Sequence, residues 1–238
     1  MRRKNLPFKK TFAVIDVYEL VSLVVTDKDS KEIALTDIGG GKFTFTMPSG
    51  NVMVNARFEQ VWENPFADIS SDKWYYEAVK FVSKTGVMNG MGSGLFLPRS
   101  NLSRAQLAQI LYNKENKPTV SGGSIFADVT GQWYTPAVVW ANKQGVVTGY
   151  GNGLFGPNDN ITREQLAVML WRYAGKPTVS NNSLNFTDTD KVSPWALDAI
   201  CWAVDLGVLK GKGNEILDPT GKATRAEAAQ MLKNYLDK

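Results

Sequence analysis

The chain has 238 residues, with 27 Lys+Arg, 23 Asp+Glu, no histidine and one cysteine. The absence of histidine excludes a Ser-His-Asp or Cys-His relay and a His-ligated zinc, and the single Cys201 excludes an internal disulfide and a multi-cysteine metal site, so we expect no metal and no cofactor. The net charge of +4 indicates a mild preference for an anionic partner. The sequence contains no long block of like charges, so we expect no nucleic-acid partner.

The N-terminus begins with Met1 and the basic residues Arg2, Arg3 and Lys4. Asp16 and Glu19 interrupt the apolar stretch that follows, which does not fit a signal peptide. We therefore expect any export signal to lie outside this sequence. No run of about 18 uncharged apolar residues occurs, so no membrane span is expected.

Residues 1–62 have a β pattern. Apolar residues alternate with polar ones over 43–47 and again over 52–58, on either side of a Pro-Ser-Gly-Asn turn, which predicts a β-hairpin. Two further strands are expected over 20–25 and 32–35. Four strands are few for an independent sandwich, so we expect a partial all-β module that acts as a spacer.

From residue 66 onward the sequence repeats itself. A Phe-x-Asp motif recurs at intervals of 60 and 60 residues, and a tryptophan, a glycine and an arginine each recur at intervals of 59 and 62. Such self-similarity indicates a repeat architecture. We predict three repeats, at 66–120, 121–180 and 181–238.

Each repeat reads as a helix, a glycine-rich loop and a second helix. In the first helix Trp74, Ala78, Phe81 and Val82 form one apolar stripe. In the third repeat Ser193–Pro194 supplies a good helix start, with a capping hydroxyl and an early proline. The first helices are expected to end at left-handed glycines, namely Gly86, Gly145 and Gly207.

The second helices open on Ser/Thr-Arg-x-Gln/Glu, which is typical of a capping box. This places Arg104, Arg163 and Arg225 at the first helical position. The helix dipole disfavours a cation there, so its occurrence in three repeats indicates a function. An arginine beside free helix N–H groups could hold a carboxylate, and the structural alternative is an ion pair with the Asp of the Phe-x-Asp motif.

Two further sets of residues are candidates for ligand binding. The first comprises the motif carboxylates Asp68, Asp128 and Asp188. They could orient the arginine or accept sugar hydroxyls, and the alternative is a turn or cap role. The second set is Trp74, Trp133 and Trp195. Each could stack on a sugar ring, and the alternative is core packing.

Together these motifs resemble the S-layer homology domain family over about Phe66–Lys238, with three tandem copies. The resemblance implies a mainly α region in which three helix-loop-helix repeats form a pseudo-trimeric prism. It also implies a non-catalytic role: anchoring an exported protein to an anionic secondary cell-wall polysaccharide that carries pyruvyl ketals, in grooves between repeats. The implied location is extracellular, at the cell wall or S-layer of a Gram-positive-type bacterium.

The family motif extends to the arginines and motif carboxylates given above, and its loop glycines correspond to Gly90, Gly149 and Gly211. The third repeat departs from the family because it lacks the Gly-x-Phe element of its loop. We therefore expect the second repeat to bind best, then the first, then the third. Residues 41–49 loosely resemble the end of a β-rich repeat of large bacterial surface proteins.

Two other functions remain open from the sequence. A carboxylate-based enzyme that processes wall glycans would need a pair of carboxylates about 5–10 Å apart in a cleft. A module for self-assembly of a surface layer would instead use exposed faces that meet copies of the same chain.

Overall fold

The computed structural model describes residues 10–11, 18–179 and 183–237, and it divides the chain into two compact units, Met1–Glu63 and Asn64–Lys238. The basic residues Arg2, Arg3 and Lys4 lie outside the described part. Within the described part, no helix is both long and apolar enough to cross a bilayer.

The first unit contains two small antiparallel sheets, so the expected all-β segment is confirmed. One sheet has the order β1 (Lys10–Thr11), β4 (Lys42–Thr44), β3 (Thr36–Asp37). The other pairs β2 (Tyr18–Thr26) with β5 (Met53–Gln60).

The predicted hairpin between 43–47 and 52–58 is wrong, because β5 pairs with β2 and β4 pairs with β3. The longer β2 offers β5 a ladder of cross-strand apolar pairs that the three-residue β4 cannot supply. The predicted strand over 32–35 is also wrong, since only Glu32 forms an isolated bridge, to Thr26. The carboxylate of Asp27 accepts the N–H groups of residues 29 and 31 and so closes a tight turn there.

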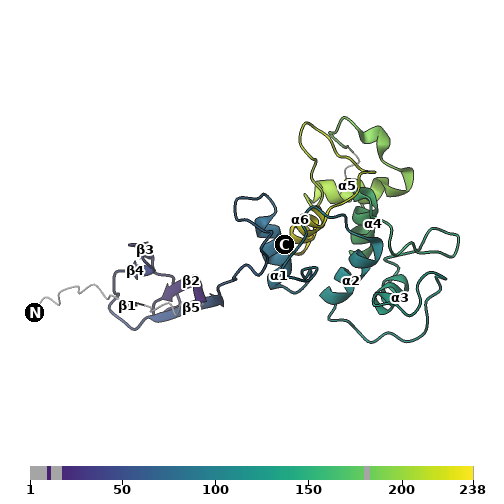
Figure 1. Ribbon diagram of the computed structural model, residues 1–238. Coiled ribbons are helices and arrows are strands. Elements are labelled where there is room, and N and C mark those ends of the chain that lie inside the picture. The colour runs from purple at the N-terminus through teal and green to yellow at the C-terminus, as the bar shows by residue number, and fades with distance from the viewer. Residues whose placement is uncertain (1–9, 12–17, 180–182, 238) are drawn as a thin grey trace, which may run out of the picture. The chain divides into compact units, whose positions relative to one another are not determined.

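The second unit is helical, which confirms the mainly α region. Its described helices are α1 (Tyr76–Lys84), α2 (Arg104–Lys114), α3 (Thr135–Lys143), α4 (Arg163–Tyr173), α5 (Leu197–Asp205) and α6 (Arg225–Leu236), with short 3-10 turns η1 (Thr189–Lys191) and η2 (Pro194–Ala196). The first helix of each repeat packs against the second helix of a different repeat: α3 on α2, α5 on α4 and α1 on α6 (Figure 1). The α1–α6 contact joins the first repeat to the third and closes the ring.

A triangle of backbone hydrogen bonds lies where the three repeats meet. The N–H of Leu102 donates to the carbonyl of Ala223, that of Ala223 to Ile161, and that of Ile161 to Leu102, each at 2.9 Å. All three side chains are fully buried. One residue from each repeat therefore satisfies the backbone carbonyl of a residue in another, so the three repeats complete one another's backbone hydrogen bonds at their meeting point.

The helix ends mostly follow the sequence signals. Capping boxes form at Ser103, Thr162 and Thr224, and the predicted glycines after the first helices have positive φ. In the third repeat the helical segment begins after Ser193 with an early Pro194, as predicted, but it begins as the 3-10 turn η2, and the expected capping hydroxyl is wrong because Ser193 makes no cap hydrogen bond. Its N–H and its hydroxyl both donate to the buried carboxylate of Glu164 on α4, each at 3.0 Å.

The motif carboxylates hold the glycine-rich loops of their own repeats. Each accepts two consecutive backbone N–H groups at 2.8–2.9 Å. Asp68 binds Phe96 and Leu97, Asp128 binds Phe155 and Gly156, and Asp188 binds Leu217 and Asp218. This is the turn role that the sequence left open as an alternative.

The loop glycines permit a close approach of the motif phenylalanines. A Cβ on Gly149, where φ is +67°, would lie 2.6 Å from the carbonyl of Leu154 and 2.6 Å from the Phe126 ring. Gly90 and Gly211 are crowded in the same way by Phe66 and Phe186. The glycine therefore lets the loop pack onto its own Phe-x-Asp motif.

We predict that Gly149→Ala lowers the free energy of unfolding by about 3 kcal/mol, the sum of a left-handed backbone penalty and a clash with fixed neighbours. Gly151→Ala is the matched control, because Gly151 also has positive φ but its Cβ would meet nothing within 4 Å; its cost should be about 1 kcal/mol. Chemical denaturation measures both, and equal losses would contradict the packing explanation.

The carboxylate of Asp188 should make the stability of the protein depend on acid pH. The N–H donated by Leu217 is the main reason that the pKa of Asp188 lies below its ordinary value. The resulting stabilisation is complete above the unfolded-state pKa of about 3.9 and is lost as the pH falls through the lower folded-state pKa. Asp188→Asn should lower the melting temperature at pH 7. It should also reduce the drop in melting temperature that the wild type shows between pH 4 and pH 2. The exposed control Asp205→Asn should change neither quantity. An unaltered pH profile in Asp188→Asn would exclude this role.

Candidate functional site

The three arginines lie at the starts of α2, α4 and α6 and reach into the loop of another repeat. The Nε of Arg104 donates to the carbonyl of Phe155 at 2.9 Å, that of Arg163 to Leu217 at 3.0 Å, and that of Arg225 to Phe96 at 2.8 Å. These side chains are almost buried, with exposed fractions of 7%, 3% and 4% in the same order. Each arginine therefore starts a helix of its own repeat and binds the loop of the next repeat around the ring.

Loop carbonyls and ring faces offset the cost of placing a cation at a helix N-terminus. Arg104 lies 4.5 Å from the centre of the Tyr150 ring, and Arg225 lies 4.6 Å from that of Phe96. Burial lowers the pKa of Arg225 to about 10, which leaves it charged at neutral pH.

A peptide group between two loop residues lies where a direct Arg–Asp ion pair was the structural alternative. In the second repeat this is the peptide that joins Phe155 to Gly156: its carbonyl accepts from Arg104, and its N–H donates to Asp128. The Leu217–Asp218 peptide connects Arg163 to Asp188 in the same way, and the Phe96–Leu97 peptide connects Arg225 to Asp68. We call this unit the peptide clamp: a loop peptide group held between a carboxylate of its own repeat and an arginine of another.

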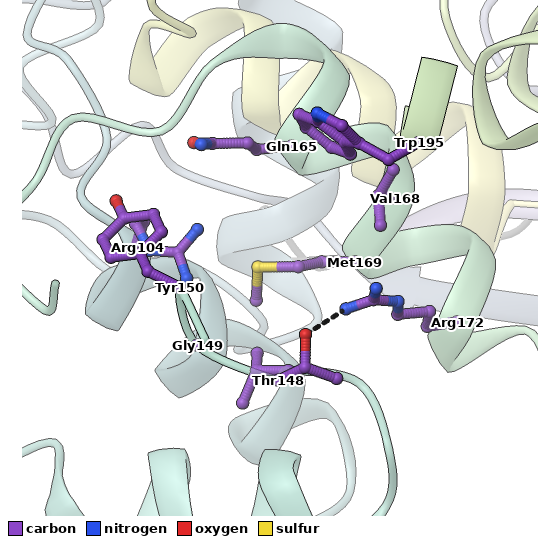
Figure 2. A pocket seen from close by; sticks show the side chains of 10 residues that line it. Arg104, Thr148, Gly149, Tyr150, Gln165, Val168, Met169, Arg172 and Trp195 are labelled. Carbon is purple, nitrogen blue, oxygen red and sulfur yellow. Dashed lines mark hydrogen bonds between the residues drawn. The ribbon is translucent and has the colours of Figure 1, made fainter. Parts of the chain in front are cut away.

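Beside the clamp of the second repeat lies the Tyr150 groove, a cavity of about 390 Å³. Its lining comprises Arg104, Val147, Thr148, Gly149, Tyr150, Gln165, Val168, Met169, Arg172 and Trp195. Figure 2 shows Arg104 and Tyr150 at one side, Arg172 at the other and Met169 between them. The described lining therefore presents two guanidinium groups and no carboxylate.

The polar groups of this groove differ in how far the protein satisfies them. Among the described residues, Arg104 donates a guanidinium hydrogen bond through Nε alone. Arg172 donates to the hydroxyl of Thr148 at 3.2 Å, and the Tyr150 hydroxyl donates to Asp159 at 2.9 Å. The terminal Nη groups of Arg104 thus keep donor capacity for a ligand.

Trp195 enters the Tyr150 groove from the third repeat. Trp74, Trp133 and Trp195 lie in the turns before the first helices, and their exposed fractions of 62%, 62% and 57% exclude core packing. Trp195 belongs to η2, directly after Ser193, whose two hydrogen bonds to Glu164 fix this turn on α4. The corresponding residues of the other second helices are Ala105 and Ala226, so only the Tyr150 groove has this tether among the described repeats.

Beside the loop of the third repeat lies the Lys212 groove, a cavity of about 590 Å³. Arg163, Gly211 and Trp74 line it together with Lys210, Lys212 and Glu227. Glu227 pairs with Arg163 at 3.2 Å and with Lys212 at 3.3 Å, and Arg163 also donates to the carbonyl of Lys210. The positive charge of this groove is therefore partly neutralised by the protein itself.

Each groove combines predicted residues from three repeats. Arg104, Gly149 and Trp195 meet in the Tyr150 groove, and Arg163, Gly211 and Trp74 meet in the Lys212 groove. Two sets of predicted residues are outside the linings of these two cavities. The first set would surround the loop of the first repeat by its repeat positions: Arg225, Gly90 and Trp133. The second set is the motif carboxylates Asp68, Asp128 and Asp188. At the loop of the first repeat, Met91 stands at the Tyr150 position, and its sulfur accepts from the amide of Gln106 at 3.8 Å.

Tyr150, Arg172 and Met169 were missed from the sequence. Tyr150 and Arg172 occupy repeat positions where the chain varies, with Met91 and Lys212 at the Tyr150 position and two asparagines at the Arg172 position. Comparing the three repeats column by column would have shown these differences in charge and aromatic character, which a search for shared landmarks passes over.

Comparisons with known proteins agree with this repeat geometry. The model of the S-layer homology domain matches residues 65–108, 125–167 and 185–229. Amylopullulanase of Thermoanaerobacterium thermosulfurigenes is 30% identical over 84% of this chain and 11% of its own length. S-layer protein sap of Bacillus anthracis is 34% identical over 70% of this chain and 20% of its own length. The surface-layer 125 kDa protein of Lysinibacillus sphaericus is 30% identical over 73% of this chain and 15% of its own length.

The chain thus spans between 11% and 20% of the length of these relatives. Two of them are surface-layer proteins by name, which supports the predicted location at the cell surface. Because the family model covers more than half of the residues in three tandem matches, the chain belongs to the S-layer homology domain family.

Proposed function

We propose that this chain anchors a larger protein to the bacterial cell wall by binding an anionic wall polysaccharide in the Tyr150 groove. The observation that carries the proposal is the pair of guanidinium groups in a lining that, over the described residues, has no carboxylate. A carboxylate on the polymer, such as that of a pyruvyl ketal, would place a counter-charge inside this lining, in addition to Asp159 and Asp128, which act on Arg104 from outside it. The exposed indole of Trp195 offers a sugar ring a flat face and an N–H donor.

The proposed order of the grooves follows from their charges. Arg104 keeps free donors, whereas Arg163 is occupied by Glu227 and the Lys210 carbonyl. An anion entering the Lys212 groove would have to displace Glu227 or bind beside its charge. The groove around the second-repeat loop is therefore proposed as the stronger site, and that around the third-repeat loop as the weaker one.

The described cavities support binding over catalysis. Glycoside hydrolysis by this route needs two carboxylates about the scissile bond. The described lining of the Tyr150 groove has no carboxylate. The described lining of the Lys212 groove has one, Glu227, which is paired with two cations. We accordingly propose a non-catalytic role for this chain.

Arg172→Gln should weaken binding of wall polysaccharide at least tenfold, because it removes one of the two cations while leaving the peptide clamp intact. The probe is polysaccharide released from sacculi of Lysinibacillus sphaericus, measured by calorimetry. Arg99→Gln is the matched control, since it removes an equal charge from an exposed position outside both linings and should bind like the wild type.

Chemical removal of pyruvate from the same polymer should abolish the difference between Arg172→Gln and the wild type. Wild-type affinity in Arg172→Gln would refute the groove as the site. Light scattering over a range of concentrations separates this function from self-assembly, which would appear as growth of particles without polysaccharide.

A further inference from the structure

A second cavity adjoins the Tyr150 groove, and Arg172 lines both. This Tyr235 cavity has a volume of about 600 Å³ and is lined by, among others, Glu115, Trp140, Gln144, Tyr173 and Tyr235. It lies at the C-terminal ends of α2, α3, α4 and α6. Neither the repeat landmarks nor the proposed anion site accounts for it.

The two cavities follow one another along the same surface. Val147 lines the Tyr150 groove and the preceding Val146 lines the Tyr235 cavity. On α4, Gln165, Val168, Met169 and Arg172 form one face of the helix and all line the Tyr150 groove. This face spans roughly 10 Å at about 1.5 Å per residue and ends at the shared Arg172, so a bound polymer that follows it arrives at the second cavity.

Aromatic rings form the walls of the Tyr235 cavity. Tyr173 lies edge-on to Trp140, with centroids 6.4 Å apart and planes at 62°, and edge-on to Tyr235 at 6.1 Å and 68°. Trp140 is buried, whereas Tyr173 and Tyr235 are only partly covered and offer ring surface to a ligand. The hydroxyl of Tyr173 donates to the carboxylate of Glu115, which fixes the ring from a different repeat.

The charges at this cavity disfavour an anion. Glu115 lines it, and so do Tyr173 and the two residues after it, where α4 ends and its dipole is negative. Arg172 provides one cation, but it lies on the border with the Tyr150 groove. Ring faces with an exposed Gln144 amide and a carboxylate acceptor are suited to a ring with an apolar face and several hydroxyl groups.

We propose that the Tyr235 cavity is a subsite for an uncharged sugar residue of the same polysaccharide chain whose charged residue occupies the Tyr150 groove. This inference rests on the proposed function of that groove. It adds a prediction that the groove alone does not make: affinity depends on the length of the glycan, and the dependence comes from residues near the C-terminus of α4.

The test uses a variant that fills the cavity and removes no native hydrogen bond of a side chain. Ala174 follows α4, is partly covered and lines the Tyr235 cavity, so Ala174→Trp should occupy it. Ala67→Trp is the control for an added surface indole, because Ala67 is exposed and lies outside the linings of both cavities. Thermal melting verifies that the variants fold.

The probe is size-fractionated wall polysaccharide from Lysinibacillus sphaericus, as fragments of one repeating unit and of several units, measured by calorimetry. The wild type and Ala67→Trp should bind the long fragment at least tenfold more tightly than the short one. Ala174→Trp should bind the short fragment within twofold of the wild type and lose most of the gain with length. The milder Gln144→Ala should lose part of that gain and nothing with the short fragment.

Two results would overturn the subsite: equal affinity of the wild type for both lengths, or a full gain with length in Ala174→Trp and Gln144→Ala. In either case binding of the short fragment, and its loss in Arg172→Gln, would leave the Tyr150 groove standing as the anion site. Failure of the wild type to bind either length would overturn the groove and the subsite together.

Discussion

The second unit depends on the peptide clamp, in which one loop peptide group is held through its N–H by a carboxylate and through its carbonyl by an arginine. Charge-assisted hydrogen bonds on both sides of this peptide polarise it in the same direction, so each strengthens the other. The carboxylate comes from the same repeat and the arginine from another, as in Asp128 and Arg104 at the Phe155–Gly156 peptide. The clamp thus shapes a loop and joins two repeats at once.

This arrangement explains how a cation can persist at the start of three helices. Helix dipoles disfavour it there, but the loop carbonyl that binds Nε lies in a fixed position, and the same guanidinium still faces a groove in Arg104 and Arg163. Structure and binding are therefore not alternatives for these residues. What differs between grooves is the partner left for the terminal Nη groups: none among the described residues for Arg104, and Glu227 with a carbonyl for Arg163.

Sequence reasoning predicted the elements of the helical unit better than their partners. Capping boxes and left-handed glycines are local signals, and the structure has both, because they act within a few residues. The predicted apolar stripe of the first helix is confirmed only in part: Ala78 and Val82 are buried, whereas Trp74 lies before α1 and is exposed. Which helix packs on which, and which arginine reaches which loop, depends on closure of the ring by contacts such as α1 on α6. The pairing predicted for the β unit was wrong for the same reason: a strand was correctly predicted where β5 lies, but its partner is the distant β2. Tyr150, Arg172 and the Glu164–Ser193 tether lie at positions that vary among repeats, where a search for shared landmarks has no signal.

The central claim is that Arg104 holds the fold through Nε while its Nη groups receive an anion of the wall polymer. Nitrogen-15 NMR of the arginine side chains during titration with wall polysaccharide tests it most directly. The account predicts that the Nε–H signals of Arg104, Arg163 and Arg225 are protected from solvent exchange before and after binding, and that ligand shifts the Nη signals of Arg104 and the side-chain signals of Arg172. Rapid exchange at Nε, or saturation with polymer that leaves both arginines unshifted, would contradict it.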